Sequence, residues 1–252
     1  MVERQDAVCV IRLNRPDARN ALTGAMIATI GAAVLDADDD PSIAAIVVTG
    51  AGDKAFCAGM DLRGFAESGA GSSGSRESID RFMRVLRGEF ATPLIGAVNG
   101  LAYAGGFELM LACDIVVAAD HARFALPEVR RGLIAGGTGV LIGARLPLPV
   151  ALEITLTGEA IEAGRAHQLG LVNRVVPAAD VFAAALSLAG TIATNGPLAV
   201  RASRELIRLS ARDIGAAEER LSHWQEVVFG SDDAREGAAA FVEKRAPVWQ
   251  GR

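Results

Sequence analysis

The stretch Pro93-Leu94-Ile95-Gly96-Ala97-Val98-Asn99-Gly100-Leu101-Ala102-Tyr103-Ala104-Gly105-Gly106-Phe107-Glu108 decides how this chain folds, because an apolar strand runs through a glycine loop into a helix. Gly105 and Gly106 carry no Cβ, so a ligand atom can come close to the backbone there. The first N–H groups of a helix have no acceptor inside it, and they suit a developing negative oxygen. Glu108 adds a carboxylate in the first turn. The stretch therefore predicts a reaction site.

Two further segments have the same character. Residues 43–50 (IAAIVVTG) are typical of a buried strand, and residues 51–63 (AGDKAFCAGMDLR) of the loop and helix start that follow it. Residues 122–132 (ARFALPEVRRG) bring a second carboxylate, Glu128, after a proline that presets the turn. Two such loops could aim two N–H donors at one oxygen, and the two carboxylates would complete an acid/base site.

Each motif taken alone also has a purely structural interpretation. The Ala-Gly-Met and Ala-Gly-Gly sequences could be only tight turns, and Glu108 could simply favour the positive end of a helix dipole. Glu128 could be a surface residue paired with Arg130 or Arg131, an arrangement that contributes little stability.

Composition indicates a soluble enzyme and excludes some other classes. The 252 residues can bury a large core, and a net charge of −5 argues against general nucleic-acid binding. Cys9, Cys57 and Cys113 are irregularly spaced, which indicates reduced thiols. The charged start, MVERQD, lacks the apolar stretch of a signal peptide. We therefore expect a cytoplasmic protein.

One apolar run, residues 94–113, approaches the roughly 20 residues that cross a bilayer. It contains Asn99, Glu108 and four glycines, and it divides into a strand, a loop and a helix. We therefore expect no membrane insertion.

The pattern along the chain predicts an α/β fold. Short apolar and β-branched runs are typical of strands covered on both faces, and Ala/Leu-rich stretches between them of helices. The predicted strands are 8–13, 43–49, 94–98, 115–118 and 171–175, and the predicted helices are 23–36, 78–89 and 107–113. From residue 196 onward only helices are predicted, at 197–210, 214–229 and 233–244. This divides the chain into a core domain, 1–195, and a helical domain, 196–252.

The Gly/Ser cluster 68–75 predicts a mobile loop beside the pocket.

In their order and spacing, AFCAGMDL (55–62), NGLAYAGGFELMLACD (99–114) and FALPEVRRGLI (124–134) resemble the enoyl-CoA hydratase/isomerase (crotonase) family. Further matches at 13–22, 156–172 and 236–245 extend the resemblance over nearly the whole chain. The resemblance implies a crotonase-type spiral of repeated ββα turns. It also implies a C-terminal all-helical trimerisation domain, and hence a homotrimer or a hexamer built as a dimer of trimers.

The same resemblance implies a function and the residues that perform it. The expected reaction adds water to a 2-enoyl-CoA to give a 3-hydroxyacyl-CoA. The N–H groups of Met60 and Gly105 would form the oxyanion hole, Glu108 would orient and activate water, and Glu128 would supply the α-carbon proton. Coenzyme A belongs to the substrate, so neither a metal nor a separate cofactor is expected.

The resemblance also assigns residues that hold the acyl-CoA thioester. They are Asn20, Ala21, Leu22, Ala58, Met60, Asp61, Leu62, Arg63, Gly105, Phe241 and Lys244. Arg63 stands where the family often has a lysine, and Lys244 matches a lysine that can reach the nucleotide of a neighbouring subunit. Each cation could instead be only a solvated surface group.

Two departures from the family concern details of the site. The family loop Pro-Gly-Ala-Gly-Gly-Thr is replaced here by Ala135-Gly136-Gly137-Thr138-Gly139, which affects water positioning and acyl fit, and Asp17 stands where relatives often have a lysine. Two alternatives remain beside the hydratase: a Δ3,Δ2-enoyl-CoA isomerase and a binding protein of the same fold without turnover. The presence of both glutamates favours hydration, and the acidic balance disfavours an RNA-binding relative.

Overall fold

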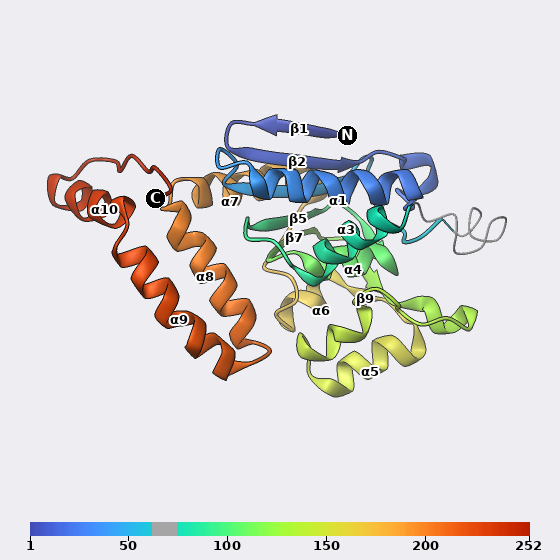
Figure 1. Ribbon diagram of the computed structural model, residues 1–252. Coiled ribbons are helices and arrows are strands. Elements are labelled where there is room, and N and C mark those ends of the chain that lie inside the picture. The colour runs from blue at the N-terminus through green and yellow to red at the C-terminus, as the bar shows by residue number, and fades with distance from the viewer. Residues whose placement is uncertain (62–74) are drawn as a thin grey trace.

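A computed structural model describes residues 1–61 and 75–252 of the chain. Two sheets carry the fold, with helices on their outer faces (Figure 1). The larger sheet has the strand order β1 (Val2–Gln5), β2 (Val8–Leu13), β3 (Ala45–Gly50), β5 (Leu94–Val98), β7 (Ile115–Ala119) and β10 (Arg174–Val176). The smaller sheet has the order β4 (Ala55–Cys57), β6 (Leu101–Tyr103), β8 (Arg123–Ala125) and β9 (Ile161–Glu162). Only β1–β2 and β8–β9 are antiparallel pairs among those described.

The helices follow the strands in the order of the chain. The α-helices are α1 (Gly24–Asp39), α3 (Arg76–Arg87), α4 (Gly105–Ala112), α5 (Leu148–Thr157), α6 (Ala163–Gln168), α7 (Val181–Ala193), α8 (Pro197–Ser210), α9 (Ile214–Phe229) and α10 (Asp232–Glu243). The 3-10 helices are η1 (Pro16–Ala18), η3 (Pro127–Arg131), η4 (Gly139–Ala144) and η5 (Ala178–Asp180).

The two sheets are built by one step repeated three times. A strand of the larger sheet is followed by a strand of the smaller one in the pairs β3 then β4, β5 then β6, and β7 then β8. Because β3, β5 and β7 are parallel neighbours, β4, β6 and β8 also become parallel neighbours. The chain therefore winds as a spiral, and the three loops that follow β4, β6 and β8 meet at one edge of the smaller sheet.

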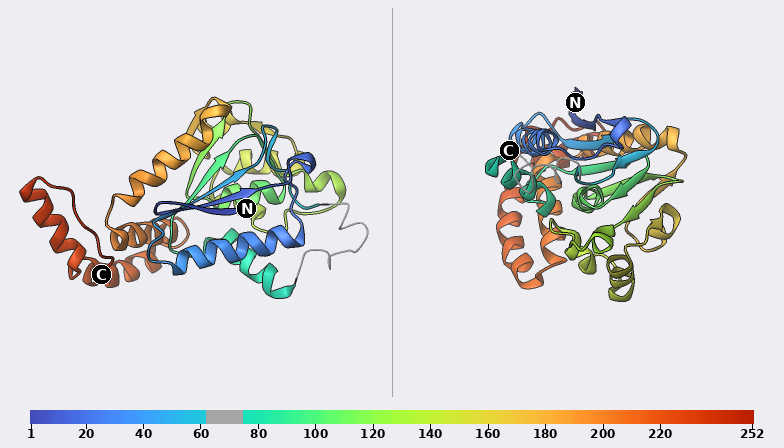
Figure 2. Two further views of the ribbon diagram at one scale, coloured as in Figure 1. Left: turned by 90° about the horizontal axis from the view of Figure 1, so that it is seen from above. Right: turned by 90° about the vertical axis from the view of Figure 1, so that its right-hand side faces the viewer.

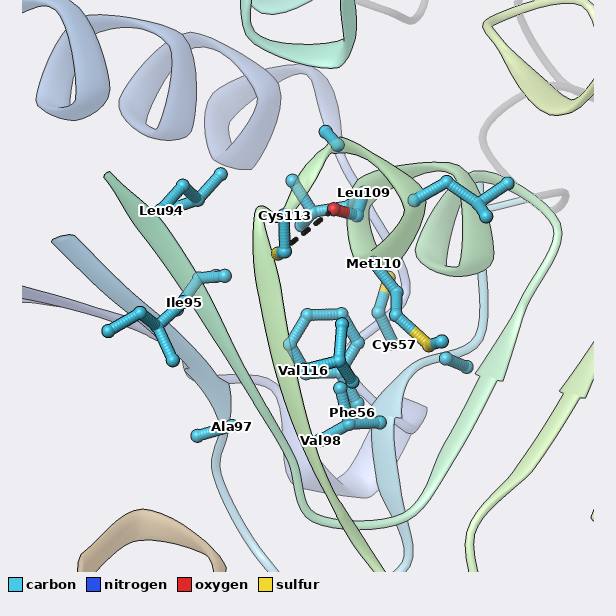
Figure 3. Close-up of a cluster of buried hydrophobic side chains, with 14 of the residues drawn as sticks. Phe56, Cys57, Leu94, Ile95, Ala97, Val98, Leu109, Met110, Cys113 and Val116 are labelled. Atoms are coloured by element: carbon cyan, nitrogen blue, oxygen red, sulfur yellow. Dashed lines mark hydrogen bonds between the residues drawn. The ribbon is translucent and has the colours of Figure 1, made fainter. Parts of the chain in front are cut away.

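Part of the hydrophobic core lies between the larger sheet and α4 (Figure 3), and α1, α3 and α7 add buried residues to the same cluster. Strands β3 and β5 are buried along their whole length, as their continuous apolar sequences predict. Every residue of α4 is buried as well. Gly106 is necessary where α4 starts, because an added Cβ there would lie 2.1 Å from the carbonyl oxygen of Cys57. This close approach fixes the N-terminus of α4 against the end of β4.

The C-terminal helices extend away from the spiral (Figure 2). Arginine side chains of α8 reach backbone carbonyl oxygens of the core: Arg204 Nη1 donates to Phe90, and Arg208 Nη1 donates to Ala112 at 3.3 Å. Phe229 and Phe241 are 75% and 86% exposed on α9 and α10. Among the described helices none alone is long and apolar enough to cross a membrane; residues 178–193 and 197–210 pass that test only as a pair bent by 112°.

The predicted elements agree with the structure where they are long. The helices at 197–210 and 214–229 have the predicted bounds, and the other predicted helices are displaced by up to three residues at either end. The predicted strand at 171–175 is wrong in its bounds, since Leu171 and Val172 are buried before β10 begins at Arg174. The strands of the smaller sheet were not predicted, because two or three residues carry no measurable periodicity. The domain boundary at residue 195 stays a prediction.

Candidate active site

The three loops at the edge of the smaller sheet carry the four groups that the sequence singles out. Met60 follows β4, Gly105 follows β6, and Glu128 follows β8, while Glu108 lies one turn into α4. Residues far apart in the sequence therefore meet because β4, β6 and β8 are adjacent and parallel.

The backbone of Met60 is oriented by an isolated parallel bridge to Leu22. Leu22 makes both hydrogen bonds of this bridge: its N–H donates to Gly59 O at 2.7 Å, and its carbonyl oxygen accepts from Asp61 N at 2.9 Å. In a parallel bridge, the N–H of the residue between those two partners points away from the bridged strand. The N–H of Met60 is therefore directed away from Leu22 and is available to a ligand.

The loop before α4 lies against Gly59. A Cβ added to Gly59 would be 2.7 Å from the Cβ of Ala104 and 3.3 Å from the nitrogen of Gly105. Ala104 has φ 52° and ψ −127°, which is unusual for a residue with a Cβ. Gly105 is the first residue of α4, so its N–H has no acceptor within the helix. The two predicted oxyanion donors thus come from loops in direct contact.

Glu108 is held in one orientation by the loop before η4. Its side chain is buried, and Oε1 accepts hydrogen bonds from Gly137 N at 3.0 Å and from Gly139 N at 2.8 Å. Backbone donors of this kind stabilise the ionised form of a carboxyl group. The space is also tight, since a Cβ on Gly137 would lie 2.5 Å from Oε2 of Glu108.

Glu128 is supported differently. It lies on the 3-10 helix η3, and its Oε2 is buried without a hydrogen-bond partner among the described residues. Burial raises the pKa of Glu128, and the negative charge of Glu108 raises that pKa further, against lowering effects of its own backbone and of Arg131. The influence of Glu108 indicates that the two carboxyl groups share one electrostatic environment.

The two arginines that follow Glu128 have other partners. Arg130 contacts Glu159 at 3.7 Å and donates to Thr157 O at 2.9 Å, so it serves another carboxylate. Arg131 donates to Pro127 O at 3.4 Å. Glu128 is therefore not a simple surface partner of either arginine in the described structure.

Some of the segments assigned to coenzyme A binding lie near the oxyanion loops. Asn20 is fully buried, and its side chain bonds to the backbone of Arg15, Ala51 and Ala55. Its amide is thus engaged in holding the loop. Around the bridge to Met60 lie Ala21, Leu22, Ala58 and Asp61. The side chain of Leu22 would be 3.5 Å from a Cβ on Gly105. The carboxylate of Asp61 pairs with Arg15 at 3.0 Å.

Other predicted binding residues do not join the site within one chain. Phe241 and Lys244 belong to α10 and the residue after it, which lie at the opposite end of the molecule from α4 (Figure 1). Leu62, Arg63 and most of the 68–75 cluster lie outside the described residues. In the described ranges no group of three or more His, Cys, Asp or Glu side chains could hold a metal ion.

Sequence reasoning missed three residues that shape the site. The amides of Gly137 and Gly139 hold Glu108, and the methyl group of Ala104 lies beside Gly59 in the other oxyanion loop. The only signal was the unusual Gly-Gly-Thr-Gly order, which indicated an altered loop without naming its partner.

Comparisons with known proteins agree with this geometry. The model of the enoyl-CoA hydratase/isomerase family matches residues 3–252. The carnitinyl-CoA dehydratase of Proteus mirabilis (strain HI4320) is 38% identical over 258 residues, covering 98% of this chain and 96% of that protein.

Two solved structures are similar over 100% of this chain and 98% of their own. The enoyl-CoA hydratase from Mycobacterium tuberculosis H37Rv has a TM-score of 0.89 and 40% identity. The carnitinyl-CoA hydratase from Mycobacterium avium has a TM-score of 0.78 and 46% identity. These findings confirm the expected enzyme class and the crotonase-type fold. The chain belongs to the enoyl-CoA hydratase/isomerase family.

Proposed function

We propose that this enzyme adds water to the double bond of a 2-enoyl-CoA to give a 3-hydroxyacyl-CoA. The proposal rests on a pair of carboxyl groups with unequal support: Glu108 is anchored by two amides, and Glu128 has a raised pKa and an oxygen without a hydrogen-bond partner among the described residues. Such a pair suits one group that orients water and one that delivers a proton.

The proposed mechanism assigns one task to each group. Glu108 accepts a hydrogen bond from the attacking water, whose hydroxyl adds to the β-carbon, and the carboxylic acid of Glu128 gives its proton to the α-carbon. Negative charge develops meanwhile on the thioester oxygen, where the N–H groups of Met60 and Gly105 would donate hydrogen bonds. Each donor would stabilise that charge by roughly 3 kcal/mol. The water gives its other proton to Glu108, from which the proton passes to the carboxylate of Glu128, restores its acid form and completes the cycle.

The test of this function is direct. Crotonyl-CoA mixed with the enzyme should lose the absorbance of its conjugated thioester and give 3-hydroxybutyryl-CoA. A 3-enoyl-CoA supplied instead should be inert. Failure to hydrate any enoyl-CoA of C4 to C16 chain length, together with conversion of the 3-enoyl-CoA into the 2-enoyl isomer, would assign the isomerase reaction.

The names of two relatives favour a second candidate substrate. Both the Proteus and the Mycobacterium avium proteins are named for carnitinyl-CoA. We therefore include carnitinyl-CoA in the substrate panel, where its dehydration is followed by the appearance of a conjugated thioester. A kcat/KM for carnitinyl-CoA above that for every unbranched 3-hydroxyacyl-CoA would assign this substrate in place of a simple fatty acyl group.

We further propose a homotrimer, or a hexamer of two trimers, assembled through the C-terminal helices. The support is the exposed apolar surface of α9 and α10, which includes Phe229, Phe241 and Val242. In such an assembly, Phe241 and Lys244 of one copy would reach the nucleotide end of another copy's site.

Light scattering after size exclusion tests the assembly. Phe241→Asp and removal of residues 197–252 should both shift the particle toward monomer or aggregate. The control Arg235→Asp changes another exposed residue of α10 and should leave the mass unchanged. An unaltered oligomer in all three proteins would contradict this assembly.

A further inference from the structure

A cavity of about 580 Å³ lies between the end of α4, the helix η4 and the C-terminal helix α8. Its walls are largely apolar and include Leu111, Ile142 and Ile207. Neither Glu108 nor Glu128 lines it, and the volume is in the range of small-ligand sites.

The charge around this cavity is unbalanced. Four guanidinium groups line it, from Arg145, Arg204, Arg208 and Arg212, against the single carboxylate of Asp114. The oxygens of Asp114 are already engaged, because Oδ2 accepts from Arg204 Nε and Leu94 N, each at 2.8 Å, and Oδ1 accepts from Arg208 Nη1. The lining therefore keeps an excess of three positive charges.

Two buried polar groups at the cavity have no partner. The side chain of Arg204 is only 7% exposed, and its Nη2 makes no hydrogen bond among the described residues. The same is true of the hydroxyl of Thr138, which is 5% exposed. Buried polar groups are normally satisfied, so two of them at one apolar cavity indicate a missing ligand. Burial also lowers the pKa of Arg204, as expected of a cation with incomplete compensation.

We propose that this cavity binds a medium-chain carboxylate. Its carboxylate would accept hydrogen bonds from Arg204 Nη2 and the Thr138 hydroxyl, near the positive charge of Arg145. Its hydrocarbon chain would lie along Leu111, Ile142 and Ile207. A bare inorganic anion would leave the apolar walls in contact with water, and an alcohol would leave the excess positive charge of the lining unbalanced.

A ligand bound in the cavity would also affect the position of Glu108. Thr138 lies between Gly137 and Gly139, whose amides hold Glu108 Oε1. A ligand that engages Thr138 should therefore alter the support of Glu108 and lower kcat without competing with the thioester. This second consequence rests on the proposed hydratase function, whereas binding itself does not.

Isothermal titration calorimetry on the full-length protein tests the binding with octanoate as the probe, and with inorganic phosphate and octanol as comparison probes. Octanoate should bind saturably, also in the presence of saturating coenzyme A, and the other two should not. Arg145→Gln should weaken octanoate binding at least tenfold, and Ser203→Trp, which adds bulk at the cavity wall, should abolish it.

Matched controls on exposed residues away from the cavity are Arg235→Gln and Ser222→Trp, which should bind octanoate like the unaltered protein. Because Ser203→Trp disturbs no buried polar group, it remains informative if Arg145→Gln fails to fold.

Displacement of octanoate by coenzyme A, equal binding to Ser203→Trp, or no binding at all would overturn the proposal. So would cross-linking through Ser203→Cys that shows a second copy of the chain filling the cavity. If octanoate binds as expected but the protein hydrates no enoyl-CoA, only the proposed function fails.

Discussion

The charge of Glu108 acts on Glu128, but the chain surrounds the two carboxyl groups in different ways. Glu108 belongs to a fully buried α-helix, and two backbone amides from another loop hold one of its oxygens. Glu128 belongs to a short 3-10 helix with no buried residue, and its Oε2 has no hydrogen-bond partner within residues 1–61 and 75–252.

The difference shows how one fold can give two identical side chains separate tasks. Amide donors favour the carboxylate form, whereas burial without donors favours the neutral acid. The charge of Glu108 itself helps to keep the proton on Glu128, because it raises the pKa of that group. The asymmetry therefore depends on loop geometry as much as on the two residues.

Removal of the proton donor should have the largest effect on kcat. Glu128→Gln keeps the size of the side chain but loses the acid, so we expect kcat to fall by about 10³-fold, with KM little changed. Stopped-flow absorbance with crotonyl-CoA measures this loss. Glu159→Gln, an exposed carboxylate nearby, serves as the control and should retain full activity. Loss of coenzyme A binding in Glu128→Gln would mean that Glu128 is structural.

Disturbing the anchor of Glu108 without touching Glu108 should have the next largest effect. In Gly137→Ala the new Cβ would lie 2.5 Å from Glu108 Oε2, so the carboxylate must move. A misplacement of this size should lower kcat about 100-fold. Gly143→Ala is the matched control, because no atom lies within 4 Å of a Cβ there. Equal activities of the two variants would show that the amide anchor is unimportant.

A change on the oxyanion side should have a smaller effect and leave both carboxyl groups in place. Ala104→Gly relieves a backbone conformation that alanine adopts at a cost, so the free energy of unfolding should rise by about 1 kcal/mol. It also removes the methyl group between the two donor loops, so kcat should fall by about tenfold. Thermal unfolding and steady-state kinetics measure the two effects. A variant that gains stability and keeps full activity would exclude a positioning role for this methyl group.

The smallest expected effect is on the pH dependence of the rate. It reports most directly on the influence of Glu108 on Glu128. Hydration requires the acid form of Glu128, so its rate should fall as pH rises through a pKa above the ordinary glutamic acid range. In Glu108→Gln the pKa of Glu128 should move down, but only in part, because burial is the larger cause of its elevation. Carbon-13 NMR of labelled glutamate follows this shift, and an unchanged or higher pKa would contradict the electrostatic coupling.

Much of this architecture could be predicted from the sequence, and the reason differs between elements. The strands β2 and β5 and the helices α8 and α9 follow their predicted bounds, because continuous apolar runs and helical spacing are local signals. The first-turn position of Glu108 is also local. The pairing of β4, β6 and β8 is not, since each strand has only three residues and is defined by its neighbours.

The candidate site divides in the same way. Motifs identified Glu108, Glu128, Met60 and Gly105, whereas the hold of Gly137 and Gly139 on Glu108 depends on contacts between distant segments. Asn20 shows the same division. Its place in the motif is local, whereas the bonds of its buried side chain to the backbone of Ala51 and Ala55 join distant segments, and its part in binding substrate stays a prediction.

The attachment of α8 has a mechanical consequence. Its arginines span a cavity to reach carbonyl oxygens and Asp114 on the core. The side chains of Arg204 and Asp114 are both largely buried, so separating them would leave two charges uncompensated away from water. Pulling α8 away from the spiral should therefore require this ion pair to break first.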